Sequence, residues 1–189
     1  MKRKVFYLLA MVLMAGSSAV FAQQPVKKGI TAAVPKDSTG YIVKVGDKAP
    51  AFSITLTNGK KLLPKDFKGK VVLLQFTASW CGVCRKEMPH LENDIWQKYK
   101  NNPNFVFIGV DRDEPVETVL KFAEQTGVTY PLGLDPAGKI FTLFAESKAG
   151  ITRNVLIDKN GHIIYLTRLF NEEEYNGLLK HVDKALSKK

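Results

Sequence analysis

The sequence contains few residues of the types that usually bind metals. It has two cysteines, Cys81 and Cys84, and three histidines in 189 residues. A structural zinc site takes four ligands, commonly two Cys-x-x-Cys pairs or one pair with closely spaced histidines. The three histidines lie far apart, and Arg85 stands where a c-type haem site would need histidine. These absences argue against structural zinc or haem, but they leave open copper or zinc handling by the cysteine pair itself.

The sequence also lacks a concentrated basic region. Its formal net charge is +10, but the lysines are scattered from Lys27 to Lys189. Proteins that bind nucleic acids gather basic residues on one face or stripe. We therefore expect a solvated basic surface and no nucleic-acid partner, and the charge favours acidic partners only weakly.

The most extended apolar run lies at the N-terminus and is too short to span a bilayer. Three cations at residues 2–4 precede the run at 5–15, and small residues precede a cleavage position after Ala22. This is the layout of a secretory signal peptide, whereas a transmembrane helix needs about 20 apolar residues. We expect residues 1–22 to be removed on secretion across the inner membrane. The mature protein would then lack a transmembrane segment and would be periplasmic in a Gram-negative source.

The remaining sequence divides into a short arm and one domain. Residues 23–40 are small and polar and show neither helical nor strand periodicity, so they are interpreted as a flexible N-terminal arm. Residues 41–189 are long enough for a single domain with a sizeable core. We find no internal repeat.

Within residues 41–189 the hydrophobic pattern predicts both strands and helices. Asn58-Gly59 and Asn160-Gly161 are strong signals for β-hairpins. Strands are predicted at 52–57, 60–63, 71–77, 105–110, 131–134, 154–158 and 162–167, and helices at 85–100, 115–125, 139–146 and 171–186. An N-terminal hairpin, a strand–helix–strand unit, a second hairpin and a last helix indicate an α/β sandwich with a mixed sheet.

The two cysteines lie where a buried strand gives way to a predicted helix. Unpaired N–H groups and the dipole at a helix start favour a thiolate at Cys81. Such an interaction, about 0.3–2 kcal/mol, lowers a thiol pKa by roughly 0.2–1.5 from a free value of about 8.5. A disulfide that closes so short a loop adds little stability. A redox pair is therefore favoured, with Cys81 attacking and Cys84 resolving. Trp80 either shields this pair or is an ordinary core residue.

The segment VVLLQFTASWCGVC, followed by RKEMPHL, and the segment NVLIDKNGHII resemble the thioredoxin superfamily, and more closely its secreted TlpA/ResA-like thiol–disulfide oxidoreductases. The similarity covers about residues 45–186. It implies a thioredoxin-like three-layer α/β sandwich with a central insertion at about 115–134. It also implies an enzyme that exchanges the Cys81–Cys84 disulfide with protein partners as a reductant. Such a protein needs no cofactor and is regenerated by a membrane or secreted electron donor.

Glu87 is the candidate proton-transfer residue that this resemblance adds. Thioredoxins place an Asp on the strand where this chain has Gln75, which cannot titrate. TlpA/ResA-like proteins often carry a Glu three residues after the second cysteine, and Glu87 fits that pattern. Partial burial would raise its pKa toward a useful range. The alternative is a surface carboxylate that pairs with Arg85 or Lys86.

The largest departure from the family pattern is Thr152, which stands where a cis-proline is expected. A cis bond before a residue other than proline costs about 3–4 kcal/mol, so the Ile151–Thr152 bond is predicted to be trans. We still expect this loop to approach the thiols, with Thr152 hydrogen-bonded to Cys81 and Arg153 adding positive charge. The candidate substrate-binding residues are Trp80, Gly82, Val83, Ile151, Thr152 and Arg153.

Two other functions stay open. Peroxiredoxin-like chains share the character of the N-terminal half, although they usually place Pro and Thr shortly before a single reactive cysteine. A copper- or zinc-handling module without turnover is the other alternative. The acidic run at 111–114 is interpreted as a connection from strand to helix rather than as a metal-binding loop.

Overall fold

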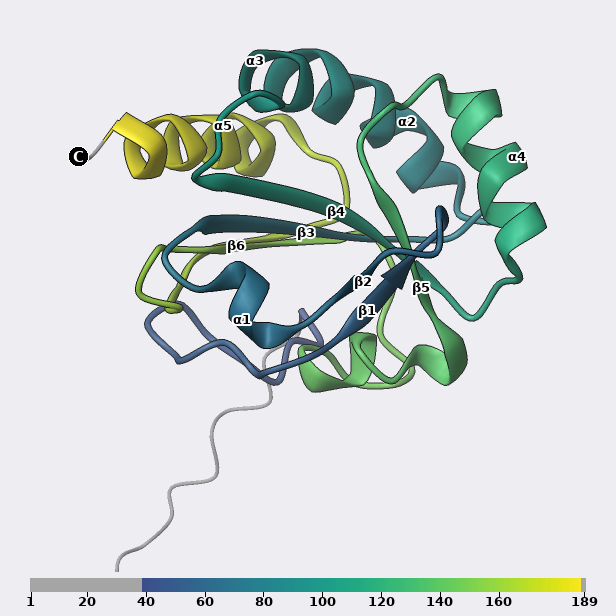
Figure 1. Cartoon of the computed structure of the whole chain (residues 1–189), viewed down its shortest axis with the longest axis horizontal. Coiled ribbons are helices and arrows are strands. Elements are labelled where there is room, and N and C mark those ends of the chain that lie inside the picture. Colours follow the sequence, from purple (N-terminus) through teal and green to yellow (C-terminus); the bar gives the residue numbers. More distant parts are fainter. Residues whose placement is uncertain (1–38, 188–189) are drawn as a thin grey trace, which may run out of the picture. The chain divides into compact units, whose positions relative to one another are not determined.

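The computed structural model describes residues 39–187 (Figure 1). The predicted signal peptide and all of the predicted arm except Thr39 and Gly40 lie outside the described residues. The strands are β1 (Ile54–Leu56), β2 (Lys61–Leu62), β3 (Val71–Thr77), β4 (Phe105–Arg112), β5 (Leu132–Asp135), β6 (Arg153–Ile157) and β7 (Ile163–Arg168). The helices are α1 (Pro64–Phe67), α2 (Gly82–Leu91), α3 (Gln97–Tyr99), α4 (Val116–Thr126) and α5 (Glu172–Ser187), with a π-helical turn η1 (Glu92–Trp96) and 3-10 turns η2 (Pro136–Gly138) and η3 (Phe141–Leu143).

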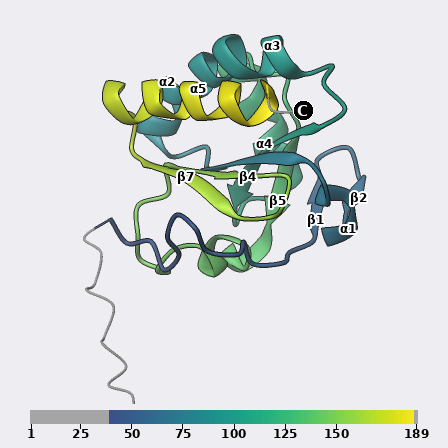
Figure 2. The same cartoon turned by 90° about the vertical axis from the view of Figure 1, so that its left-hand side faces the viewer.

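The seven strands form one mixed sheet in the order β2-β1-β5-β4-β3-β6-β7. The pairs β3–β4 and β4–β5 are parallel, and the other pairs are antiparallel. Helices α2, α3 and α5 cover one face of this sheet in both views (Figures 1 and 2). The 3-10 turns cover the other face. There the centroid of the Phe76 ring lies 5.4 Å from that of Phe141 and 5.6 Å from that of Phe144. The three-layer thioredoxin-like α/β sandwich predicted from the sequence is confirmed.

Strand β3 forms the centre of the core because both of its faces are covered. All seven of its residues, Val71–Thr77, are buried, which explains its continuous run of β-branched and aromatic residues. Burial of each large apolar side chain contributes roughly 1.5–3 kcal/mol. The strand is therefore held firmly, and so is the cysteine motif that follows it.

The parallel register brings the ends of β3 and β4 to one edge of the sheet. Thr77, the last residue of β3, pairs with Asp111 near the end of β4. On the other side of β3, Gln75 pairs with Asn154 of β6. In an open α/β sheet, functional groups gather at the carboxyl ends of parallel strands. Cys81 comes shortly after the end of β3 in the sequence and therefore lies at this edge of the sheet.

Most predicted elements appear within a few residues of their expected bounds, but the helix predicted at 139–146 is wrong. Two 3-10 turns, η2 and η3, occupy this region instead. The Asp135 carboxylate accepts hydrogen bonds from the backbone N–H groups of Ile140 (2.7 Å) and Phe141 (2.8 Å). Ala137 and Gly138 have φ values of 59° and 63°. The chain therefore folds around one buried carboxylate, and a longer helix does not form.

The helix that carries the cysteines begins earlier in the chain than predicted. Helix α2 begins at Gly82, three residues before the predicted start, and continues through η1 and α3 to Tyr99.

Within residues 39–187, no helix is both long enough and apolar enough to cross a membrane.

Candidate active site

Cys81 and Cys84 form a disulfide at the start of α2, with their Cα atoms 5.3 Å apart. Cys81 is the N-cap of the helix, and its Sγ accepts a hydrogen bond from the Cys84 backbone N–H at 3.1 Å. Cys81 is 7% exposed, whereas Cys84 is fully buried. A partner molecule can therefore reach only Cys81, which supports an attacking role for Cys81 and a resolving role for Cys84.

Thr152 lies directly against both sulfur atoms. Its Oγ1 is 3.2 Å from Cys81 Sγ and 3.3 Å from Cys84 Sγ. Sulfur atoms in a disulfide carry no hydrogen, so the Thr152 hydroxyl is the donor. The described residues contain no cis peptide bond, which confirms the trans Ile151–Thr152 bond. The threonine thus occupies the position facing the disulfide and offers a hydrogen-bond donor that proline lacks.

Replacement of Thr152 by valine is expected to slow the reaction of reduced Cys81 with iodoacetamide at pH 7 by about threefold to tenfold. Valine keeps the shape of the side chain but removes the hydroxyl. A hydrogen bond to a charged group contributes about 1.5–3 kcal/mol, and this one would stabilise the Cys81 thiolate. Only about half of this free energy appears in the rate, because a more basic thiolate is also more nucleophilic, with a Brønsted coefficient of about 0.4–0.5. Thr152→Ser keeps the hydroxyl and is the matched control. Equal rates for the valine variant and the unmodified protein would show that the contact does not act on the thiolate.

Glu87 lies in a buried polar network one helical turn after Cys84. Its Oε2 accepts from Gln75 Nε2 at 3.1 Å, and its Oε1 accepts from Asn154 Nδ2 at 2.7 Å. Tyr130 donates its hydroxyl to Gln75 Oε1 at 2.6 Å, and Asn154 Nδ2 also donates to the Thr167 hydroxyl. Gln75, Glu87 and Asn154 are essentially inaccessible to solvent. Glu87 is therefore a buried acid held by amides rather than a surface carboxylate paired with a cation.

Burial raises the pKa of Glu87 to about 7. The hydrogen bonds from Gln75 and Asn154 favour the carboxylate and oppose this shift, but loss of solvation is the larger effect. A carboxyl group with this pKa is present in both protonation states at neutral pH. It is therefore suited to accepting or donating a proton close to Cys84.

Arg153 is directed away from the disulfide. Gln75 and Asn154 face α2 through Glu87, so their strand neighbours Phe76 and Arg153 face the opposite side of the sheet. The Arg153 guanidinium lies 4.4 Å above the Tyr41 ring, and its Nε donates to a backbone oxygen at Gly150. The structure thus brings Thr152 to the sulfur atoms, but it places the side-chain charge of Arg153 on the other face.

Exposed apolar residues lie next to the accessible cysteine in the sequence and next to the backbone of Thr152. Trp80 is 66% exposed and Val83 37% exposed, so Trp80 is not a core residue. Ile151 is buried, and Gly82 leaves open space where a side chain would lie. Leu169, which the sequence did not suggest, is 46% exposed, and its backbone N–H donates to the Thr152 carbonyl at 3.0 Å.

Leu169 also has a left-handed backbone with φ of 61°, which is rare for a residue with a bulky side chain. Such backbone conformations are concentrated at functional sites. The only sequence signal for Leu169 is its position directly after the last strand.

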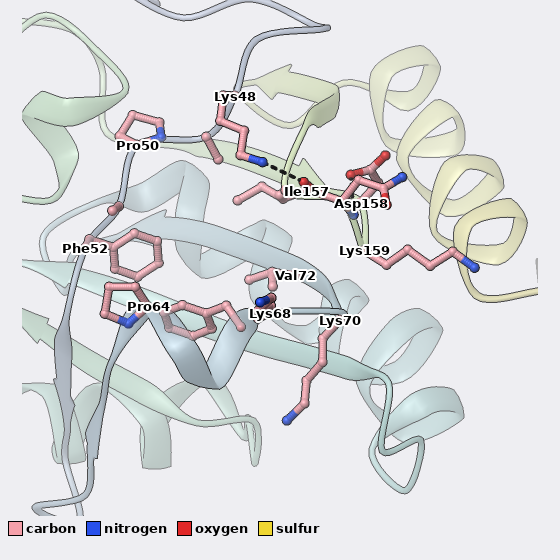
Figure 3. Close-up of a pocket in the computed structure, with 15 residues that line it drawn as sticks. Lys48, Pro50, Phe52, Pro64, Lys68, Lys70, Val72, Ile157, Asp158 and Lys159 are labelled. Atoms are coloured by element: carbon pink, nitrogen blue, oxygen red, sulfur yellow. Dashed lines mark hydrogen bonds between the residues drawn. The ribbon is translucent and has the colours of Figure 1, made fainter.

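A separate hollow of about 210 Å³ lies at the opposite end of the sheet (Figure 3). Val72, near the start of β3, and Phe52 contribute to its apolar lining, and Lys48 donates from its Nζ to the Asn160 carbonyl at 2.9 Å. Neither cysteine lines this hollow. Over residues 39–187, no group of three or more His, Cys, Asp or Glu side chains is arranged to hold a metal ion.

The disulfide lies at the start of a helix that follows the central strand of a mixed sheet, and both faces of that sheet are covered. This arrangement defines a thioredoxin-like thiol–disulfide exchange protein. The chain belongs to the Redoxin family, whose profile matches residues 44–186.

Named relatives agree with this assignment. The chain is 37% identical over 130 residues to the thiol-disulfide oxidoreductase ResA of Bacillus thuringiensis subsp. konkukian, covering 66% of this chain and 73% of that protein. A candidate protein disulfide isomerase from Bacteroides thetaiotaomicron, solved in solution, is 60% identical with a TM-score of 0.77, covering 80% of this chain and 95% of that one. A candidate thiol:disulfide interchange protein DsbE from Chlorobium tepidum is 29% identical with a TM-score of 0.64, covering 77% and 99%.

These relatives and the cysteine geometry establish a ResA-like member of the thioredoxin superfamily that acts as a thiol–disulfide oxidoreductase on protein thiols. The prediction drawn from the cysteine motif is therefore confirmed. The peroxidase and metal-handling alternatives are not favoured by the relatives or by the disulfide.

Proposed function

We propose that the protein reduces disulfides of partner proteins outside the cytoplasm. The observation that carries the reductive direction is that, among residues 39–187, the side-chain and backbone groups bonded to Cys81 Sγ are neutral. Two neutral donors reach its sulfur, the Cys84 N–H and the Thr152 hydroxyl, while the charge of Arg153 is directed elsewhere. Strong oxidants of this class owe their high potential to a stabilised reduced form. A Cys81 thiolate held by the helix start and by neutral donors, without a cationic side chain, therefore favours a lower potential than that of such oxidants, and so a reducing role.

The proposed reaction starts from the reduced dithiol. The Cys81 thiolate attacks one sulfur of the partner disulfide, forms a mixed disulfide and releases the other partner sulfur as a thiolate. Glu87 accepts the proton of the Cys84 thiol, and the new thiolate attacks Cys81 Sγ. The second partner sulfur leaves as a thiolate, the two partner thiolates take up one proton from Glu87 and one from water, and the Cys81–Cys84 disulfide is restored. A membrane or secreted dithiol protein must then return two electrons to the enzyme.

The proposed partner surface consists of Trp80, Val83 and Leu169 around Cys81, with the backbone of Thr152 held in place by Leu169. Exposed apolar side chains around a reactive group are typical of binding sites for partner proteins. Partner segments with apolar residues next to the target cysteine would fit this surface. The location outside the cytoplasm rests on the signal-peptide pattern of residues 1–22.

One experiment tests both the direction and the compartment. The mature protein would be purified from the extracytoplasmic fraction of its source, its N-terminal residue determined, and its Cys81–Cys84 potential measured in dithiothreitol or glutathione buffers. We expect an N-terminus at Gln23 and a potential near that of thioredoxin, about −270 mV. A potential near −120 mV, typical of a strong oxidant, would contradict a reducing role. A protein with no reversible two-electron transition would contradict the exchange function, and an intact signal sequence would contradict the location.

A further inference from the structure

A pair of carboxyl groups lies beside the turn that precedes Cys81, and the exchange reaction does not use them. Glu114 Oε2 accepts a hydrogen bond from the Ser79 backbone N–H, and Glu114 Oε1 accepts one from the Ser79 hydroxyl, both at 2.5 Å. Arg85 of α2 donates from its Nε to the Ser79 carbonyl at 2.8 Å. Ser79 is thus held from two sides, two residues before the attacking cysteine.

Asp111 is the buried group behind this contact. It has no solvent exposure, and neither of its carboxyl oxygens has a hydrogen-bond donor among the described residues. A buried carboxylate without donors is strongly disfavoured and takes up a proton instead. The neighbouring carboxyl group is that of Glu114, and two adjacent carboxyl groups can form a hydrogen bond only when one of them carries a proton. Asp111 is therefore a neutral acid that donates to Glu114.

We propose that Asp111 and Glu114 share one proton and act as a positioning pair that fixes the Ser79 turn and so presents Cys81 to partner disulfides. This inference rests on the proposed exchange function. When the proton is lost, the buried carboxylate of Asp111 and the half-buried carboxylate of Glu114 lie next to each other and repel. Glu114 is then displaced from Ser79, and the turn before Cys81 loses its anchor on that side.

In the described part of the chain, no cation is placed to replace the shared proton. Asp135 on β5 adds further negative charge. Arg85 is bound to Ser79 and to Gln125. Arg112 extends to the opposite face of the sheet, where it lies over the Phe141 ring.

Burial first, and then the charge and hydrogen bond of Glu114, raise the pKa of Asp111 to about 8. Asp111 is therefore protonated at neutral pH and ionises in mildly alkaline solution, where its charge repels that of Glu114. The described geometry thus makes the anchoring of the Ser79 turn sensitive to pH.

The test is the pH profile of Cys81 reactivity in the reduced protein. The rate with 5,5′-dithiobis(2-nitrobenzoate) would be measured from pH 6 to 10 and divided by the thiolate fraction obtained from absorbance at 240 nm. We expect this normalised rate to fall by roughly tenfold above pH 8, since small displacements of a reacting group can cost up to about a hundredfold. Asp111→Asn keeps a hydrogen-bond donor that cannot ionise, so its normalised rate should stay constant.

Two further variants separate positioning from folding. Asp111→Leu fills the same space without a donor, so it should react slowly at every pH. Glu114→Gln can still accept from Ser79 without carrying charge, and should also lose the alkaline fall. The inference is overturned if the unmodified protein shows no fall, or if Asp111→Asn shows the same one. The pH profile of Asp111→Asn tests the inference even if Asp111→Leu does not fold. Failure of the exchange function itself would appear differently, as an unmodified protein without a reversible disulfide.

Discussion

Replacement of Cys84 by serine is expected to convert the protein into a trap for its partners, while replacement of Cys81 abolishes exchange altogether. Cys81 is the accessible sulfur, so it can still attack a partner disulfide when Cys84 is absent. No second thiol then releases the mixed disulfide, because the sequence contains no other cysteine. Reduction of insulin disulfides should fall to the background rate for both variants. Non-reducing electrophoresis and mass spectrometry should show the covalent complex only with Cys84→Ser.

The two single variants control for each other because they remove the same disulfide. Any loss of stability from the missing bond is shared, and the short loop makes that loss small in the chain-entropy account. A mixed disulfide that accumulates with Cys81→Ser instead would reverse the assigned roles. Equal trapping by both variants would mean that Cys84, although buried in the oxidised structure, is equally accessible after reduction.

Much of the fold could be predicted because its signals are local. The run of apolar residues at 71–77 and the Asn-Gly turns specify strands and hairpins within short windows of sequence. The cysteine pair and Thr152 also stood out locally, as a motif and as a departure from a pattern. The structure places these residues together at one edge of the sheet.

The polar network around Glu87 could not be predicted because it depends on strand register. Asn154 reaches Glu87 only because β6 pairs with β3 so that Asn154 lies beside Gln75. Tyr130 reaches the same network from the segment before β5. A lone Asn in an otherwise apolar strand was the available signal. It indicates a buried polar contact but does not identify the partner.

The side of the sheet that Arg153 faces could not be predicted because the strand was expected to begin only at residue 154. Strand β6 begins at Arg153, and successive side chains of a strand point to opposite faces of a sheet. Asn154 faces Glu87, so Arg153 faces the other side, where it packs on Tyr41. Asp111 is a different case. Its position in the sequence suggested a segment that connects a strand to a helix, but the long β4 strand places Asp111 inside the sheet. There its protonation state depends on burial and on the neighbouring Glu114.

Replacement of Glu87 by glutamine is expected to change stability in a way that depends on pH. The pKa of Glu87 is about 7 in the folded protein against a model-peptide value of 4.5. Because the folded state binds the proton more tightly, stability from this group is fully present below pH 4.5 and is lost as pH rises through 7. The difference corresponds to roughly 3 kcal/mol of unfolding free energy. Urea unfolding at pH 4.5 and pH 8 should therefore show glutamine gaining about that much, relative to glutamate, at the higher pH.

Glutamine should be accommodated because the network can adjust. Asn154 Oδ1 has no hydrogen-bond partner among the described residues. Rotation of the Asn154 amide would turn this oxygen toward the N–H group of glutamine, or toward the proton of a protonated Glu87. Glu117→Gln, at an exposed position of α4, is the matched control and should leave the pH dependence unchanged. A glutamine effect that is equal at both pH values would contradict the raised pKa.

The same variant distinguishes a proton-transfer role from a purely structural one. General acid–base catalysis contributes about 10²–10⁴-fold in rate, so resolution of the mixed disulfide by Cys84 should slow by roughly a hundredfold in Glu87→Gln near pH 7. Attack by Cys81 on a small disulfide should change little, because Glu87 is not bonded to Cys81. Stopped-flow measurement of the two steps separates them. If stability shifts with pH as expected while resolution keeps its rate, Glu87 is a buried acid that the fold tolerates, and the proton of Cys84 must leave by another route.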